Sequence, residues 1–258
     1  MQTLVYGPTL QATGAFDGGN ITEQKPIGFP GEGSVVKRVG PLFYWAWAHS
    51  RRDGYIGLHP HQAFEIMTYV IHGKAEHGDT LGTRSTVGPG GVQIMQTGSG
   101  VSHEERFIGP DMEGFQIWFE PHFDEALNRK PTYHQFEHEQ FPIVEGDGYV
   151  KKTVIGQGAP VEIVVDALMW DVEIQPGREY HHSIPSDRTL TALAIRGAGA
   201  WSIGPGDEKS TAFHHKDFIV AQADDAQEIA IRASDEAPLR LILIEVPTKV
   251  DYPLYPKR

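Results

Sequence analysis

Two short motifs carry side chains suited to binding a divalent metal ion. His59-Pro60-His61 places two imidazoles at positions i and i+2, and His103-Glu104-Glu105 places an imidazole and a carboxylate at the same spacing. Residues i and i+2 of a β-strand project from one face, so each pair can hold a single ion. Neither pair is specific by itself, because the composition gives roughly 0.65 His-x-His by chance. Whether these motifs bind a metal must therefore be judged from the sequence around them.

The elements expected around these motifs are strands. The 29 Gly and 18 Pro residues separate short apolar segments at regular intervals, which is typical of many strands joined by tight turns. Only residues 124–129, where acidic residues lead and Arg129 closes the segment, favour a short helix. The expected strands cover residues 34–39, 63–72, 74–77, 91–95, 113–119, 149–155, 167–174, 189–195, 200–203 and 239–246.

The chain contains a weak internal duplication. A strand, a glycine and a second strand occur around Gly73 and again around Gly197, and we interpret each as a hairpin that pivots on the glycine. A His-bearing segment precedes each, at residues 54–61 and 176–182. This predicts two similar all-β barrels with the short helix at their junction.

Composition excludes several classes of protein. The formal net charge of -12 opposes direct nucleic-acid binding, which needs clustered Lys and Arg. The absence of Cys excludes a disulfide scaffold and any mechanism that uses a thiol. No apolar run reaches membrane-spanning length, and no Lys or Arg precedes Lys25 as a secretory signal would require. We therefore expect a cytoplasmic protein without membrane contact.

The motifs stand in an ordered series that resembles the cupin pattern and, within the cupins, the pirin family. The match over residues 57–105 is highly specific, and it continues more loosely into the second half of the chain. The matching residues are His59-Pro60-His61 with Phe64-Glu65, Met67-Thr68-Tyr69-Val70, Glu76-His77-x-Asp79-x-Leu81-Gly82, Val92-Gln93-x-Met95, and Gly98-x-Gly100-x-x-His103-x-Glu105.

The resemblance implies a bicupin, that is, two tandem jelly-roll-like cupin β-barrels. Residues 1–130 would form the metal-binding barrel, and residues 131–258 a degenerate barrel without metal. It also implies one divalent transition metal, with Fe(II) favoured over Zn, Ni, Mn or Cu. The implied ligands are His59, His61, His103 and Glu105, with water in the remaining positions.

Glu65 departs from the general cupin pattern. In cupins the Glu after His-x-His is usually a ligand, whereas in pirins that role looks transferred to the Glu of His-x-Glu. Strand parity alone places Glu65 on the ligand face, so direct ligation and hydrogen bonding behind the ligands both stay open. The alternation of side chains along the strands also predicts which residues line the same cavity as the ligands, although a bulge would move them to the opposite face. The predicted apolar wall consists of Ala63, Met67, Tyr69 and Phe107.

The remaining histidines have ordinary interpretations. We expect His72 and His77, which flank the first predicted hairpin, to be solvated turn residues. The adjacent pair His181-His182 points to opposite faces of a strand and cannot chelate together. The position thirty residues after Gly73 is His103, but the equivalent position thirty residues after Gly197 is Gln227. The second half therefore lacks the His-x-Glu ligands, and we expect no second metal.

Two functions follow from the resemblance. The first is a quercetin 2,3-dioxygenase-like enzyme that opens a flavonol-type polyphenol with O2, with Glu105, or else Glu65, as proton acceptor. The second is an iron-bearing redox sensor that modulates a protein partner without turnover. Gly91 and Ile94 stand where pirins commonly have Asp and Trp, which affects substrate choice more than metal binding. A metal-free binding module is the third possibility. We expect a monomer in each case.

Overall fold

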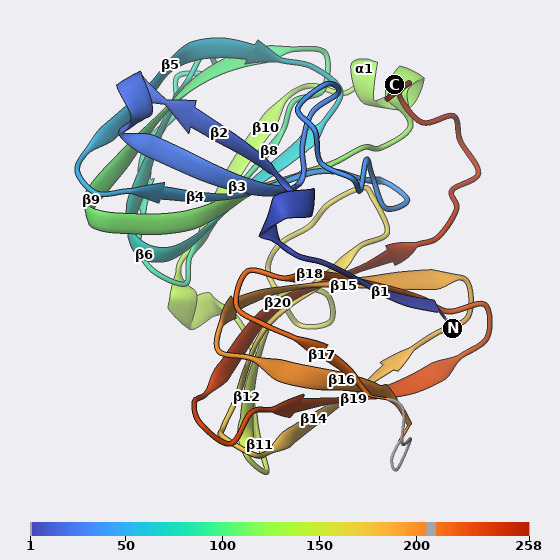
Figure 1. Ribbon diagram of the computed structural model, residues 1–258. Helices are drawn as coiled ribbons and strands as arrows, with labels where there is room; N and C mark the ends of the chain where they lie inside the picture. The colour runs from blue at the N-terminus through green and yellow to red at the C-terminus, as the bar shows by residue number, and fades with distance from the viewer. Residues whose placement is uncertain (1, 205–209, 258) are drawn as a thin grey trace. The chain divides into compact units, whose positions relative to one another are not determined.

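The computed structural model describes residues 2–204 and 210–257, and the predicted all-β fold is confirmed (Figure 1). The only α-helix in these residues is α1 (Phe123–Leu127), close to the predicted position. Three 3-10 turns accompany it: η1 (Pro8–Leu10), η2 (Asp17–Gly19) and η3 (His138–Gln140). No helix among the described residues is long and apolar enough to cross a membrane.

The chain forms two compact units, which are not the continuous halves 1–130 and 131–258. The first unit comprises Leu10–Gln140, Val161–Val165 and Asp251–Arg258. The second comprises Met1–Thr9, Phe141–Pro160 and Asp166–Val250. Strand pairing causes the difference, because β1 (Gln2–Tyr6) pairs with β18 (Phe218–Gln222) of the second unit. Likewise, β10 (Thr132–Phe136) pairs with β8 (Val92–Gln96) of the first.

The first unit is built on a nine-stranded sheet with the order β10-β8-β6-β9-β4-β3-β2, in which β5 also pairs with β9 and β7 with β6. Its two longest strands, β6 and β9, hold it together. The remaining bounds are β2 (Ala12–Phe16), β3 (Ile21–Ile27), β4 (Leu42–Ser50), β5 (Gly54–His61), β6 (Glu65–Asp79), β7 (Arg84–Val87) and β9 (Val101–Phe119).

The predicted hairpin at Gly73 is wrong, because β6 continues through this residue. Both halves of β6 pair with β9, as Val70 opposite Gly114 and Lys74 opposite Ile108 show, and the register shifts around His72. Gly73 has φ 74°, and a Cβ there would lie 2.7 Å from the Ile108 carbonyl oxygen. The glycine therefore bends the strand instead of reversing it.

The second unit contains two sheets that share one apolar core, including Val172, Trp201 and Leu243. The seven-stranded sheet has the order β1-β18-β15-β20-β13-β12-β11, and the four-stranded sheet β14-β19-β16-β17. The remaining bounds are β11 (Ile143–Gly146), β12 (Tyr149–Ile155), β13 (Leu168–Ile174), β14 (Glu179–Ile184), β15 (Arg188–Arg196), β16 (Gly199–Ile203), β17 (Thr211–Phe213), β19 (Gln227–Ala233) and β20 (Leu239–Pro247).

Gly197 is not a hairpin pivot either. The strands on its two sides, β15 and β16, belong to different sheets, so the glycine marks a corner where the chain passes from one sheet to the other. Its φ is 73°, and a Cβ would collide with the Pro238 carbonyl oxygen. The similarity between the two halves thus comes from two sharp bends of the backbone, one at Gly73 and one at Gly197. At each bend a side chain would collide with a neighbouring carbonyl oxygen.

Candidate metal centre

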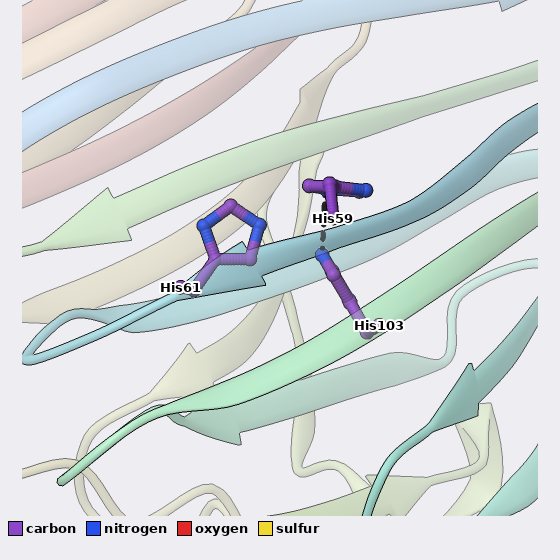
Figure 2. A group of neighbouring side chains, drawn as sticks. All are labelled: His59, His61 and His103. Atoms are coloured by element: carbon purple, nitrogen blue, oxygen red, sulfur yellow. Dashed lines mark hydrogen bonds between the residues drawn. The ribbon is translucent and has the colours of Figure 1, made fainter.

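Antiparallel pairing of β5 with β9 brings three of the four predicted ligands together. His59 lies directly opposite His103, and His61 follows on the same face of β5 (Figure 2). One ligand atom from each histidine lies within 4.8 Å of the other two, and Nε2 of His59 is 3.0 Å from Nε2 of His103. Two strands thus converge three imidazoles on one point.

The nitrogen atoms are arranged as a metal would require. His59 Nδ1 lies 2.8 Å from the Gly57 carbonyl oxygen, so donation there leaves the Nε2 lone pair directed at the cluster. His61 Nε2 is buried and has no hydrogen-bond partner among the described residues. Neighbouring ligand atoms of an octahedral ion with bonds of about 2.1 Å are about 3.0 Å apart, which matches the His59 to His103 separation. The residues present therefore fit a bound ion.

The electrostatics keep the imidazoles in the form that binds metals. The pKa of His61 is lowered to about 3, mainly by burial and also by the nearby imidazoles of His103 and His59. Burial lowers the pKa of His103 to about 3 as well, with His59 and His77 contributing in the same direction. Only the neutral imidazole offers a lone pair, so both residues are ready to ligate at neutral pH.

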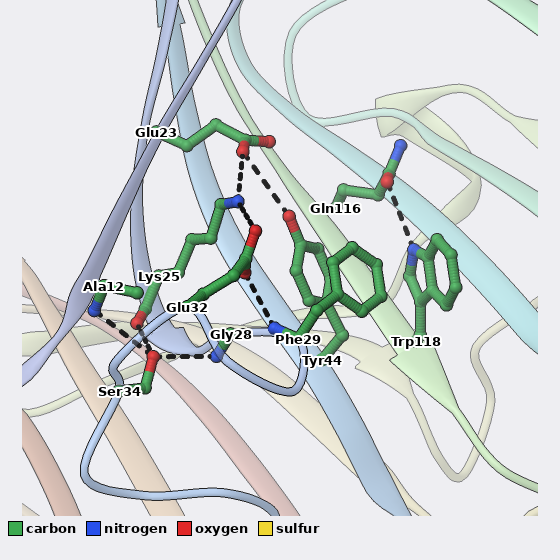
Figure 3. Close-up of polar contacts among 10 residues, drawn as sticks. All are labelled: Ala12, Glu23, Lys25, Gly28, Phe29, Glu32, Ser34, Tyr44, Gln116 and Trp118. Atoms are coloured by element: carbon green, nitrogen blue, oxygen red, sulfur yellow. Dashed lines mark hydrogen bonds and ion pairs between the residues drawn. The ribbon is translucent and has the colours of Figure 1, made fainter. Parts of the chain in front are cut away.

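Glu105 lies beside the cluster but outside the three-histidine group. It is buried on the same face of β9 as His103, at 3% exposure. Gln116 Nε2 donates to its Oε2 at 2.7 Å, and the Thr68 hydroxyl donates to its Oε1 at 3.3 Å. Trp118 Nε1 in turn donates to Gln116 Oε1 at 3.1 Å (Figure 3). The carboxylate is thus held in a fixed orientation.

Glu65 does not reach the histidines. Its carboxylate accepts hydrogen bonds from Gln96 Nε2 at 2.6 Å and from the backbone N–H groups of Val164 and Val165 at 2.7 and 3.0 Å. Ala63, with φ 66°, breaks the extended backbone between the end of β5 at His61 and the start of β6 at Glu65. The alternation of side chains in β5 therefore does not predict the face on which Glu65 lies. In the structure Glu65 is thus hydrogen-bonded behind the ligands and is not part of the histidine cluster.

The same interruption changes the predicted cavity wall. Thr68 is the residue of β6 that contacts Glu105, so Met67 and Tyr69 project from the opposite face, contrary to the parity prediction. Ala63 borders a separate cavity together with Glu65. Phe107 does project from the face that carries His103, and it is buried in an apolar cluster of the first unit.

The prediction that His77 is a solvated turn residue is wrong. It is 5% exposed, and its ring stacks on that of Tyr133 with centroids 4.2 Å apart. Its Nε2 lies 2.8 Å from Asp79 Oδ2, and its ring centroid is 5.4 Å from that of His103. The continuation of β6 past Gly73 buries it. The His77-x-Asp79 spacing was the signal that would have found it.

An aromatic wall adjoins the cluster. The Trp118 ring lies perpendicular to that of His61, with centroids 4.7 Å apart. Phe29 contacts Trp118 edge-on at 5.0 Å and stacks on Tyr44 at 4.2 Å. Glu32 fixes the Phe29 segment by accepting hydrogen bonds from the Phe29 backbone and from the buried Lys25 ammonium (Figure 3). The sequence pattern did not mark Phe29, Tyr44 or Glu32.

The second unit places its histidines differently. His182 is buried, with Nε2 3.0 Å from Glu245 Oε2 and Nδ1 3.2 Å from the Tyr180 hydroxyl. His181 is exposed beside Glu179 and Glu228, so the two neighbours do point to opposite faces. Within residues 2–204 and 210–257, the His59, His61 and His103 group is the only cluster of three or more potential metal ligands.

Fold and site together define a two-barrel protein of the cupin type. The Pirin family model matches residues 45–119, which contain all four predicted ligands. A Pseudomonas aeruginosa protein whose name proposes quercetin 2,3-dioxygenase activity is 34% identical over 200 residues, covering 71% of this chain and 68% of that protein. The chain therefore belongs to the pirin family, as the sequence predicted.

Other relatives agree with this assignment. A pirin-like protein of Solanum lycopersicum is 30% identical over 192 residues, covering 72% of this chain. The chain spans 63%, 59% and 53% of the length of the tomato, Arabidopsis thaliana and Caulobacter vibrioides relatives.

Two solved structures share the fold. GK1651 from Geobacillus kaustophilus matches with a TM-score of 0.78 at 22% identity, covering 97% of both chains. The Escherichia coli pirin YhhW, solved in complex with nickel(II), matches with a TM-score of 0.76 at 21% identity, covering 95% of this chain and 99% of that one.

Proposed function

We propose that this protein is a metal-dependent dioxygenase that opens the ring of a flavonol-type polyphenol with O2. The observation that carries the proposal is the convergence of three imidazoles, one with a buried nitrogen that has no partner among the described residues. Three imidazoles and one carboxylate leave two positions of an octahedral ion open, as catalysis requires. The names given to the Pseudomonas aeruginosa relatives support this substrate class.

His59, His61 and His103 would hold the ion, with Glu105 as the fourth ligand. We favour Fe(II); Zn, Ni and Cu also suit imidazole donors, and Mn suits the carboxylate and water oxygens. When bound, the ion supplies a Lewis acid that stabilises the deprotonated 3-hydroxyl of the flavonol. Glu105 accepts the proton from that hydroxyl, and Gln116 holds the carboxylate in place. The Trp118 and Phe29 rings offer an apolar wall for a flat polyphenol.

Turnover tests this proposal. Anaerobically purified protein, loaded separately with Fe(II), Ni(II), Mn(II) or Cu(II), is mixed with quercetin and O2. We expect the visible band of quercetin to bleach and carbon monoxide to be released with at least one metal. The His59→Ala variant should do neither. Metal binding without bleaching under every condition would contradict the enzyme and favour a redox-sensing regulator that acts on a protein partner.

A further inference from the structure

A cavity of about 240 Å³ lies in the first unit, apart from the histidines. Glu65 lies in its lining and projects from the face of β6 opposite to Thr68, the residue that contacts Glu105. The walls are apolar and are formed mainly by Phe64, Pro121, Ala126 and Val164. None of the residues that line it belongs to the candidate metal centre.

The polar groups of this cavity are engaged with one another. Gln96 Nε2 donates to Glu65, and the Thr132 hydroxyl donates to Gln96 Oε1 at 2.9 Å. The Val164 and Val165 backbone N–H groups donate to Glu65 as well. A ligand inside the cavity therefore need not replace any of these hydrogen bonds, and its body would contact the apolar walls.

Two cations border the same cavity. Arg129 and Lys130 line it and are exposed, and neither side chain has an ion-pair or hydrogen-bond partner in the part of the chain that the structure describes. Burial raises the pKa of Glu65, while its hydrogen bonds and the charge of Arg129 oppose that rise. The lining thus holds two positive charges and one carboxylate that is already hydrogen-bonded, so the cavity favours an anion.

We propose that this cavity is a second ligand site, which takes a small carboxylate with an apolar body such as one aromatic ring. The ring would pack between Phe64, Pro121 and Ala126, and the carboxylate would face Arg129 and Lys130. The volume lies below the roughly 300–1,000 Å³ of sites for drug-sized ligands, which limits the occupant to about one ring. The site is independent of the proposed dioxygenase activity.

Calorimetry on the full chain tests the ligand class. The probes are phenylacetate, its neutral analogue 2-phenylacetamide and the cation 2-phenylethylamine, which share one ring and differ in charge. We expect phenylacetate to bind at least about tenfold more tightly than the amide, and the amine to bind most weakly. The same affinity is expected in chelator-treated protein and in His103→Ala, because the metal centre takes no part.

Variants locate the site. The exposed pair Arg129→Gln/Lys130→Gln should weaken phenylacetate binding about tenfold and leave the amide unchanged. The control pair Arg51→Gln/Lys74→Gln removes the same charge at other exposed positions and should change neither. Ala126→Leu fills the cavity and should abolish both. Equal affinity for acid and amide, an equal effect of the control pair, or loss of binding in His103→Ala would overturn the proposal.

Discussion

At the scale of single residues, burial keeps two of the three clustered histidines neutral. His61 and His103 remain neutral because their surroundings disfavour the charged imidazole, and both have a pKa lowered to about 3. The spacing of His59, His61 and His103 predicted their convergence, since i and i+2 share a strand face. The roles of Glu65 and Met67 were not predictable this way, because the left-handed backbone of Ala63 breaks the alternation.

The lowered pKa values make the metal-free protein sensitive to acid. Below about pH 6.5 the unfolded chain protonates these histidines while the folded chain does not, so stability falls as the pH drops from about 6.5 toward 3. We expect a loss of about 1 kcal/mol per histidine per pH unit in urea unfolding experiments on the apo protein. In His103→Gln the loss of unfolding free energy per pH unit should be smaller by the contribution of one histidine, about 1 kcal/mol. An unchanged slope would show that His103 is not held neutral by the fold.

His77 should affect metal binding without being a ligand. His77→Leu removes the ring that packs beside His103 and leaves Asp79 without its imidazole partner. We expect the metal dissociation constant to rise about 10-fold or more, measured by competition with a chromogenic chelator. The matched control is His72→Leu on the same strand, where the histidine is exposed. Equal effects of the two substitutions would contradict a specific role for His77.

At the scale of elements, the long bent strands β6 and β9 position the site. The sequence around Gly73 predicted a hairpin, because a glycine between two expected strands is typical of a turn. The true partner of both runs is β9, whose paired residues lie 24 or more positions away in the sequence, and such long-range pairing cannot be seen in a local pattern. The predicted short helix was found, since its order of acidic residues followed by Arg129 is a local signal.

Gly73→Ala should destabilise the first unit. The substitution adds a Cβ at positive φ within 2.7 Å of a backbone oxygen, so the strand must shift. We expect a loss of about 2–3 kcal/mol in urea unfolding. Gly82→Ala is the control, because its φ is also positive but no atom lies within 4 Å of the added Cβ, so it should lose only about 1 kcal/mol. Equal losses would mean that the close approach at Gly73 is unimportant.

At the scale of the whole molecule, the spacing of Gly and Pro predicted an all-β chain, and the internal duplication and the family resemblance predicted two barrels. The sheets of the two units agree with that prediction. The division into units was less predictable. β1 pairs with β18, and residues 161–165 join the first unit through the backbone hydrogen bonds to Glu65. These contacts join residues 99 or more positions apart, for which the sequence has no local signal.

The central claim is that this chain binds one transition metal ion through the histidines of its first unit. The most direct test is elemental analysis of gently purified protein beside His61→Ala and His103→Ala. We predict about one transition metal ion per wild-type chain, and less than about 0.1 in either variant. Metal content below about 0.1 in the wild type, or content that either variant retains, would contradict the account.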